Sequence, residues 1–347
     1  MHTGSLGAVV TLLLVTGSGR SGTSSVAGSL KRLGFHVPQP ENPPDERNPR
    51  GYYEPQWVSQ FHLQWLNGIP VRTIDTRPDA GAVAMATATP ERREALRTWL
   101  AEELAQHGPD DVVVVKETRA YWVYPLWRDV AEELGARLVS LTMLRHPTQV
   151  VRSRDAAYLS HRPDAVRLQR ETANTAAWVN SVVVTERQSR TNPRAFVPYV
   201  ELIDDWRTTL FRACRQLDVD PGRFDAPHPV DDFLTAELNR SDDTWNGLTV
   251  PDEVRDLAER TWTAARALAV DPDDAVARTA LDVIGEEYVT LHAFAAAVAT
   301  DDTLAKVAAE RQRLQRRLDT KNHRIAGLRS RVAELEAELG IEPEPDA

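Results

Sequence analysis

A glycine-rich turn near the N-terminus carries groups that could bind an anion. Residues 17–25 read GSGRSGTSS and lie between an apolar run and a segment of helical character. Such a turn points successive backbone N–H groups, and the positive end of a helix dipole, at one place. A structural turn needs glycine but not the polar donors Arg20, Ser21, Thr23 and Ser24. The turn is therefore predicted to bind a phosphate or a sulfate.

This turn has the glycine spacing of a nucleotide-binding P-loop but not its lysine. Gly17 and Gly22 stand at the spacing of a Walker A loop, and Thr23 occupies the lysine position. An ATPase or kinase of that class would lose its contact to the β- and γ-phosphates. Arg20 is the cation of the turn that could replace the lysine. The pattern favours a nucleotide with a different charged end, and a P-loop kinase acting on a small molecule is the alternative.

Arg145 and Ser153 form a second candidate anion site. Arg145 follows the apolar run 137–144, expected to be the fourth strand, at the edge where doubly wound sheets bind ligands. Pro147 fits the first turn of a helix over 147–159, which would also carry Ser153. A cation and a hydroxyl could thus converge on one oxyanion, in a site separate from the first.

The elements that must position these groups alternate between strand and helix. Apolar runs rich in Val and Leu are expected to be strands buried on both faces, and segments with helical periodicity follow them. This alternation predicts an α/β domain with a doubly wound parallel sheet and a mostly helical second half. The predicted strands are 8–15, 112–115, 137–144 and 195–200, and the predicted helices include 26–33, 90–106, 121–134, 252–269 and 273–298.

The C-terminal segment has a heptad pattern. Nine of the eleven seam positions between residues 304 and 339 are apolar, and Arg311 and Lys321 are the exceptions. The pattern predicts a coiled coil. A single helix cannot bury this stripe against itself, so a homodimer is favoured over packing onto the chain's own domain. The expected division is a domain at 1–300, a coiled-coil helix at 301–340 and a disordered acidic tail at 341–347.

The composition of the chain limits which kinds of partner and bound group are expected. The 347 residues include 41 Lys+Arg and 51 Asp+Glu, and the net charge of −10 argues against a general nucleic-acid or anionic-membrane binder. The longest apolar run, 8–15, is too short to span a bilayer and lacks secretory features, so a cytoplasmic protein is expected. Cys214, the only cysteine, is expected to be a small buried residue. The histidines show no HExxH spacing, and no bound metal is expected.

The two candidate anion sites together resemble those of sulfotransferases that use 3′-phosphoadenosine 5′-phosphosulfate (PAPS). The phosphosulfate loop of that family has Lys or Arg followed by Ser-Gly-Thr, as residues 20–23 have here. Its 3′-phosphate site has an arginine and a serine eight residues apart, as Arg145 and Ser153 are. The resemblance spans about residues 9–240 and is greatest to bacterial members, which have segments similar to 48–54 and 233–241.

The resemblance implies transfer of a sulfuryl group from PAPS to a hydroxyl of a small molecule, or of a carbohydrate or glycolipid. Ser25 stands where many members have a tryptophan that stacks on adenine, so the stacking residue is open. Tyr199 would lie beside the adenine, and Arg240 would close over the 3′-phosphate, which Arg145 and Ser153 hold. The 5′-phosphosulfate would be held by Gly19, Arg20, Ser21, Gly22, Thr23 and Ser24.

The resemblance also implies catalytic residues. Lys116, after the strand 112–115, would contact the transferring group together with Arg20. Many eukaryotic members have a histidine two residues after this lysine, where this chain has Thr118. Carbohydrate sulfotransferases tend to use a glutamate from the region after the first helix, and by position the resemblance implies Glu54 as the base. Its carboxylate is ionised at neutral pH and can accept a proton. Glu117 and His62 are the alternatives.

Two further questions stay open at the level of the sequence. Acceptor identity would depend on residues such as Trp57, Phe61 and Trp65 and on the segment 160–190. The non-enzyme alternative is a catalytically inactive sulfotransferase-like scaffold that recruits a partner through its coiled coil.

Overall fold

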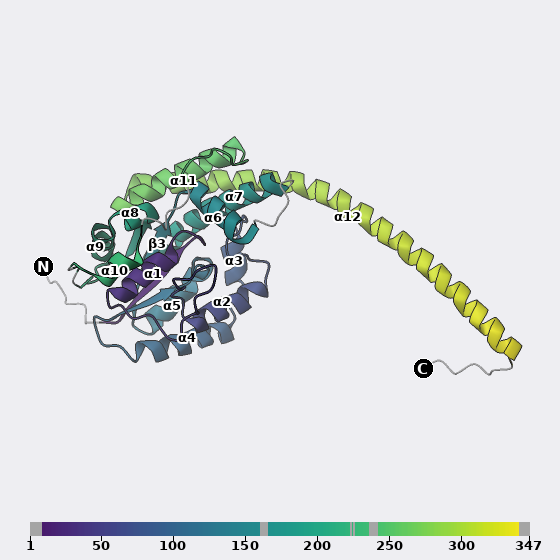
Figure 1. Cartoon of the computed structure of the whole chain (residues 1–347), viewed down its shortest axis with the longest axis horizontal. Helices are drawn as coiled ribbons and strands as arrows, with labels where there is room; N and C mark the ends of the chain where they lie inside the picture. The colour runs from purple at the N-terminus through teal and green to yellow at the C-terminus, as the bar shows by residue number, and fades with distance from the viewer. Residues whose placement is uncertain (1–8, 160–165, 223, 225, 236–241, 340–347) are drawn as a thin grey trace. The chain divides into compact units, whose positions relative to one another are not determined.

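The computed structural model describes residues 9–159, 166–222, 224, 226–235 and 242–339 (Figure 1). The chain divides into two compact units, Met1–Val289 and Thr290–Ala347, which are described separately below. Within the described residues, no helix combines the length and the apolar character that a membrane crossing requires.

A four-stranded parallel sheet forms the centre of the first unit. Its strands are paired in the order β2-β1-β3-β4, so β1 is flanked on both sides. The register aligns Val15 with Lys116 and Gly17 with Met143, which brings the carboxyl ends of the strands to one edge. The strands are β1 (Thr11–Gly17), β2 (Val112–Lys116), β3 (Arg137–Leu144) and β4 (Arg194–Pro198).

The predicted strands are confirmed, with changes at their ends. β1 begins at Thr11, two residues after the exposed Val9, and continues to Gly17. β4 ends at Pro198, and Tyr199 opens a helix in place of the last strand residues. Arg145 follows the third strand and not a fourth, because the strand Arg194–Pro198 comes later in the chain.

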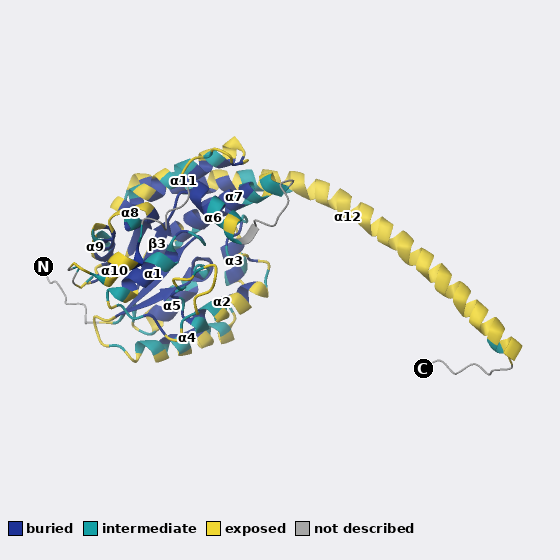
Figure 2. Cartoon of the chain, viewed as in Figure 1, coloured by how far each residue is buried: buried dark blue, intermediate teal, exposed yellow. Residues whose placement is uncertain are grey.

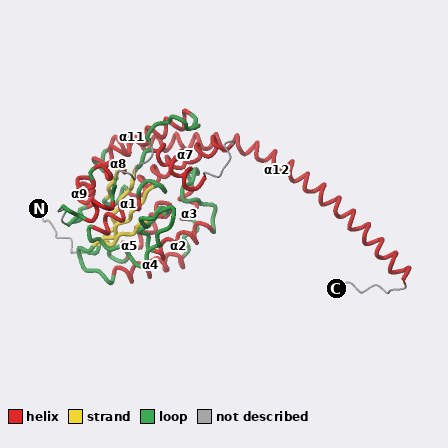
Figure 3. The backbone as a smooth tube through the Cα atoms, viewed as in Figure 1, coloured by secondary structure: helices red, strands yellow, loops and turns green. Residues whose placement is uncertain are grey.

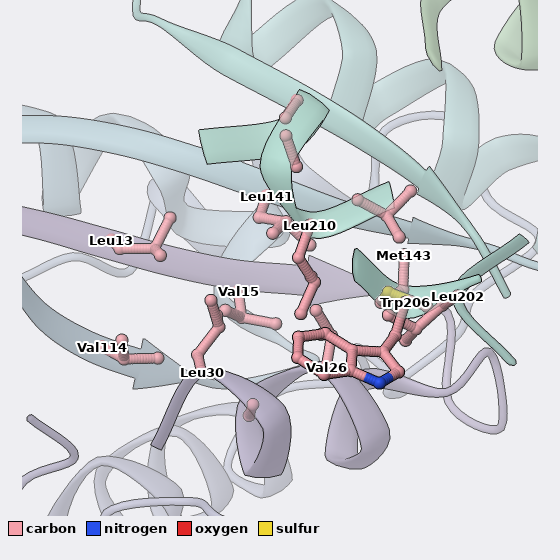
Figure 4. Close-up of a cluster of buried hydrophobic side chains, with 14 of the residues drawn as sticks. Leu13, Val15, Val26, Leu30, Val114, Leu141, Met143, Leu202, Trp206 and Leu210 are labelled. Atoms are coloured by element: carbon pink, nitrogen blue, oxygen red, sulfur yellow. The ribbon is translucent and has the colours of Figure 1, made fainter. Parts of the chain in front are cut away.

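Helices cover both faces of this sheet, as a doubly wound arrangement requires. Leu13 and Val15 face one hydrophobic cluster and Leu12 and Leu14 face the other, because successive strand residues point to opposite faces. The first cluster, shown in Figure 4, is completed by α1 (Thr23–Arg32), α8 (Tyr199–Asp204), α9 (Trp206–Leu217) and α10 (Pro229–Phe233). The second is completed by α2 (Gln56–Asn67), α3 (Ala80–Met85), α4 (Pro90–Leu104), η1 (Ala120–Val123) and α5 (Tyr124–Glu133).

The second half of the first unit is mostly helical, as predicted, and Figure 3 shows this in the colours of the backbone tube. The expected helix at 147–159 divides into an α-helix and a short π-helix. Cys214 is buried on α9, and burial raises the pKa of its thiol to about 12, so the prediction of a small buried residue is confirmed. Besides α8, α9 and α10, this half contains α6 (Pro147–Arg154), the π-helix η2 (Asp155–Leu159), α7 (Arg167–Ser189) and α11 (Asp252–Val270).

One long helix, α12 (Ala275–Leu339), replaces the separate segments expected at 273–298 and 301–340. Its first residues belong to the first unit, where Leu281, Ile284 and Tyr288 are buried. The seam residues of the second unit, such as Leu314 and Leu318, are about half exposed, and Figure 2 colours this part of the helix as exposed. Coiled-coil pairing stays a prediction.

Candidate active site

The glycine-rich turn follows β1 and leads directly into α1. A Cβ on Gly17 would lie 2.8 Å from the Met143 carbonyl oxygen, and one on Gly22 would lie 2.2 Å from the Tyr199 ring. Both glycines also have positive φ, a conformation that residues with a side chain rarely adopt. Arg20 shares this conformation, with φ of 74°. The turn thus depends on glycine at the two positions where β3 and Tyr199 approach its backbone.

Unsatisfied donors gather at this turn. Gly22 caps α1 without a side-chain hydrogen bond, so the first N–H groups of the helix have no side-chain acceptor at the cap. The hydroxyls of Ser18 and Ser21 are buried and have no partner among the described residues. An oxyanion at the start of α1 would accept hydrogen bonds from such groups and would lie at the positive end of the helix dipole.

Arg145 lies on the same side of the sheet as this turn. Its Nη1 donates to the carbonyl oxygen of Arg20 at 3.3 Å, and its guanidinium lies 4.6 Å from the centre of the Tyr199 ring. Tyr199 in turn packs against Gly22. Burial lowers the pKa of Arg145; Tyr199 opposes this effect and Arg20 adds to it. A buried guanidinium next to a second one is a favourable place for an anionic ligand.

The two candidate anion sites are contiguous and not separate. Ser153, expected to serve the site of Arg145, accepts a hydrogen bond from the Arg20 Nε at 3.0 Å. The positive φ of Arg20 turns its carbonyl group toward Arg145 while its side chain reaches α6. One residue of the turn therefore joins both sets of predicted ligands. Arg240, the remaining predicted contact to the 3′-phosphate, lies outside the described residues.

Lys116 and Glu54 form an ion pair beside the start of α1. The Lys116 Nζ lies 2.5 Å from the Glu54 Oε1 and 3.4 Å from the Ser24 hydroxyl. Asn42 donates from Nδ2 to the other carboxylate oxygen of Glu54 at 3.2 Å. Lys116 is 3% exposed and Glu54 is 12% exposed. The lysine is therefore shielded from solvent, whereas the carboxylate keeps some accessible surface.

The segment that carries Glu54 folds across the first turn of α1. Asn48 donates from Nδ2 to the Ser24 hydroxyl at 3.1 Å and to the carbonyl oxygen of Gly51 at 2.7 Å. Ser24 therefore contacts both Asn48 and Lys116. Asn42 and Asn48 did not emerge from the sequence as functional candidates, although Asn48 opens the segment 48–54 that ends at Glu54.

The two alternative bases are enclosed. Glu117 and His62 have no exposed side-chain surface, and Nδ1 of His62 lies 3.8 Å from the Glu117 carboxylate. Arg119 donates from Nε to Glu117 at 2.7 Å, and Trp127 donates to Nε2 of His62 at 3.2 Å. Burial alone would raise the pKa of Glu117, but His62 and Arg119 outweigh it and hold the pKa at about 2. Neither side chain is therefore accessible to a bound molecule, whereas the Glu54 carboxylate keeps some exposed surface.

The aromatic residues expected to shape the acceptor site pack into the second hydrophobic cluster. Trp57 stacks on Phe61 and on Trp99, each with ring centres 5.0 Å apart. Trp65 is buried and donates from Nε1 to the Thr87 hydroxyl at 2.8 Å. These rings serve the core because α2 turns its apolar face toward α4 and α5, as the shared cluster shows.

Comparison with known proteins found similarity at the level of structure. No protein-family model matches the chain, and no curated protein does. One similar solved structure is the sulfotransferase domain of the olefin synthase from Synechococcus PCC 7002, at 17% identity and a TM-score of 0.39; the match covers 72% of this chain and 93% of that one. Another is the sulfotransferase domain from the curacin biosynthetic pathway, at 15% identity and a TM-score of 0.33, covering 70% and 82%.

Proposed function

We propose that the chain is a sulfotransferase that moves the sulfuryl group of PAPS to a hydroxyl group of a small molecule or carbohydrate. The proposal depends on the continuity of the two predicted anion sites. Together they form one site, called the anion cradle below, made of the glycine-rich turn 17–25, Arg145 and Ser153. Arg20 contacts both Ser153 and Arg145, and unpartnered buried hydroxyls lie in the same turn. PAPS has two anionic ends on one nucleoside, and a continuous site with two guanidinium groups suits such a ligand.

The transfer itself would take place between the cradle and the Glu54–Lys116 pair. The acceptor oxygen forms a bond to sulfur, and the bond from sulfur to the bridging oxygen of the phosphosulfate breaks. Adenosine 3′,5′-bisphosphate leaves, and the proton of the acceptor hydroxyl passes to the Glu54 carboxylate. Lys116 and Arg20 would stabilise the negative charge that develops on the bridging and sulfuryl oxygens.

Nucleotide recognition follows from the same contacts. Gly19 through Ser24 would hold the 5′-phosphosulfate, and Arg145 with Ser153 the 3′-phosphate. The ring of Tyr199, which packs on Gly22 and under Arg145, would lie beside the adenine. Burial raises the pKa of Tyr199, more than Arg145 and Ser25 lower it, so its hydroxyl stays neutral and can donate a hydrogen bond.

Thermal melting with nucleotides tests this proposal. Adenosine 3′,5′-bisphosphate should raise the melting temperature by linkage, and ATP with magnesium should have much less effect. Arg145→Ala should weaken bisphosphate binding by about 1.5–3 kcal/mol, because a charge-assisted contact is lost. Arg97→Ala, on the exposed surface of α4, is the matched control. Equal stabilisation by both nucleotides, or unchanged affinity of the Arg145 variant, would contradict the proposal.

Turnover separates the enzyme from its alternatives. Incubation with sulfur-labelled PAPS and a panel of hydroxylated acceptors should give a labelled product. Bisphosphate binding without any transfer would favour an inactive scaffold, and phosphate transfer from magnesium ATP would favour the small-molecule kinase.

We also propose that the second unit pairs with a second copy of the chain. Its apolar seam is exposed on the single chain, and burying such a stripe is what drives coiled-coil formation. The full-length chain should sediment as a dimer at micromolar concentration, and Leu314→Asp with Leu318→Asp should give a monomer. Ala309→Asp, at an exposed position outside the seam, is the control. A monomeric full-length chain would contradict this proposal.

A further inference from the structure

A cavity of about 750 Å³ lies next to the proposed transfer site, a size suited to a small organic molecule. It is bounded by the end of α2, the loop that follows it, and one side of α7. Leu66, Val71 and Ala177 give it an apolar wall, and all three are buried. None of the aromatic residues expected from the sequence to contact the acceptor is among its lining residues.

Two arginines connect this cavity to the transfer site. Arg154 lines the cavity, and its Nη1 would lie 3.3 Å from a Cβ on Gly19 of the glycine-rich turn. Arg119 also lines it; burial lowers the pKa of this arginine, but Glu117 and Glu54 outweigh burial and raise it. Arg119 is thus within electrostatic reach of the proposed base. A molecule in this cavity would have one end close to Arg154 and Gly19.

The polar part of the cavity wall is strongly positive. Four arginines line it, Arg72, Arg77, Arg119 and Arg154, against one carboxylate, Asp75. Arg77 binds both oxygens of Asp75 from Nε and Nη2, at 3.0 and 2.8 Å. Even when Asp75 and the Glu117 partner of Arg119 are counted, positive charge is in excess. Clefts with one sign of charge concentrate ligands of the opposite sign.

Two partly buried arginines of the wall are held by neighbouring side chains. Arg154 donates from Nε to Oδ1 of Asn174 at 3.3 Å, and Arg119 is bound by Glu117. Arg72, in contrast, has a side chain that is 65% exposed, with its Nε 3.7 Å from Asp75. Arg72 is therefore the most exposed arginine of the wall, and it can form a charge-assisted contact with an anionic group that reaches the cavity from solvent.

We infer that the acceptor of this enzyme is an anionic molecule, with an apolar body and a carboxylate or phosphate group that the arginines of this cavity bind. The inference rests on the proposed function, since it names the substrate class of the same site. The acceptor hydroxyl would lie at the end of the cavity next to Arg154 and Gly19, and the anionic group would lie beside Arg72, the most exposed arginine of the wall.

Calorimetry on the full chain saturated with adenosine 3′,5′-bisphosphate tests the inference without turnover. The probes are 10-hydroxydecanoate, 10-hydroxydecyl phosphate and the neutral 10-hydroxydecanamide, which share one body and one hydroxyl. At least one anion should bind about tenfold more tightly than the amide. The tighter of the two anions identifies the group that the acceptor carries.

Variants of Arg72, the most exposed arginine of the cavity wall, test where the anionic group binds. Arg72→Gln should weaken the anions by about threefold to tenfold and Arg72→Glu by more, with the amide unaffected. Arg97→Gln and Arg97→Glu make the same charge changes on α4, outside the cavity, and should leave the preference intact. Equal binding of amide and anions, binding of none of them at about 1 mM, or an unchanged preference in the Arg72 variants would overturn the inference.

The nucleotide experiment keeps the two proposals distinguishable. If the bisphosphate stabilises the chain but the anions are not preferred, the acceptor class is wrong and the sulfotransferase assignment stands. If the anions bind in an Arg72-dependent way while the bisphosphate does not stabilise the chain, the cavity binds anions but the acceptor assignment falls with the proposed function.

Discussion

Two carboxylates lie at the carboxyl end of β2, each paired with a cation, and their surroundings differ. Glu54 reaches Lys116 from a segment 62 residues earlier in the chain, and the pair retains some exposed surface. Glu117 pairs with Arg119 only two residues away, and its side chain has no exposed surface. Neighbouring positions on one strand end therefore hold two ion pairs with opposite access to ligands.

This difference in exposure is what distinguishes the base that we propose from a carboxylate that stabilises the fold. A carboxylate enclosed among His62, Arg119 and the core stays ionised but cannot meet a substrate proton. In the proposed reaction Glu54, which keeps some exposed surface beside Lys116, would accept the proton of a bound hydroxyl. Ion-pair geometry alone would not tell the two apart, because both pairs are close; burial does.

The largest expected effect is on turnover in Glu54→Gln. The amide cannot accept the proton of the acceptor, so sulfate transfer should fall by about 10²- to 10⁴-fold. Bisphosphate affinity should stay the same, because Glu54 faces Lys116 and Asn42 and not the cradle. Single-turnover transfer assays and calorimetry measure the two quantities separately. Turnover at the level of the unchanged chain would remove Glu54 as the base.

Glu117→Gln should act on stability instead. It leaves the mostly buried Arg119 without its charge partner, and breaking a buried pair costs about 3–5 kcal/mol of unfolding free energy. Urea denaturation measures this loss. Turnover per folded molecule should fall far less than in Glu54→Gln, because Glu117 reaches the cavity only through Arg119, so each variant serves as the control for the other. A Glu117 variant that is fully stable but inactive would reverse the two roles.

The same residue predicts a dependence on pH. The pKa of Glu117 is about 2 in the folded chain, below the ordinary value of 4.5 for a glutamate. Because the folded value is the lower one, its contribution is fully present above pH 4.5 and is lost as pH falls toward 2. The difference in unfolding free energy between the unchanged chain and Glu117→Gln should thus be larger at pH 6 than at pH 3. A difference that is constant over this interval would contradict the assignment.

The smallest effect is expected from Asn42→Ala, which removes the hydrogen bond to the second oxygen of Glu54. A single hydrogen bond contributes about 0.5–1.5 kcal/mol, so turnover should fall by roughly twofold to tenfold with unchanged bisphosphate affinity. In a Glu54→Gln background the same substitution should cost nothing further, because the two residues act through one carboxylate. Additive losses would show that Asn42 acts elsewhere.

Local features were predictable from the order of residues. The run 137–144 became β3 with the same bounds, and the glycine-rich turn joins β1 to α1 as expected. Strand and helix periodicity, and the conformational demands of Gly17 and Gly22, act over a few residues and can be read directly. Less predictable was the helix at 275–339, where two expected segments join because no proline or glycine cap separates them.

Contacts between residues far apart in the sequence could not be predicted in this way. Trp65 belongs to the core and Trp57 packs against it, although both were expected to shape the acceptor site. Arg119 and Arg154, which line the cavity, were not singled out from the sequence. The resemblance had already favoured Glu54 over Glu117, but only the folded chain shows that Glu117 is enclosed and that Glu54 keeps exposed surface. Residue type and spacing set the chemical groups available and the elements that carry them. Which groups meet, and which of them water or a substrate can reach, is set by packing between segments distant in the chain, because burial and charge pairing arise only when those segments come together.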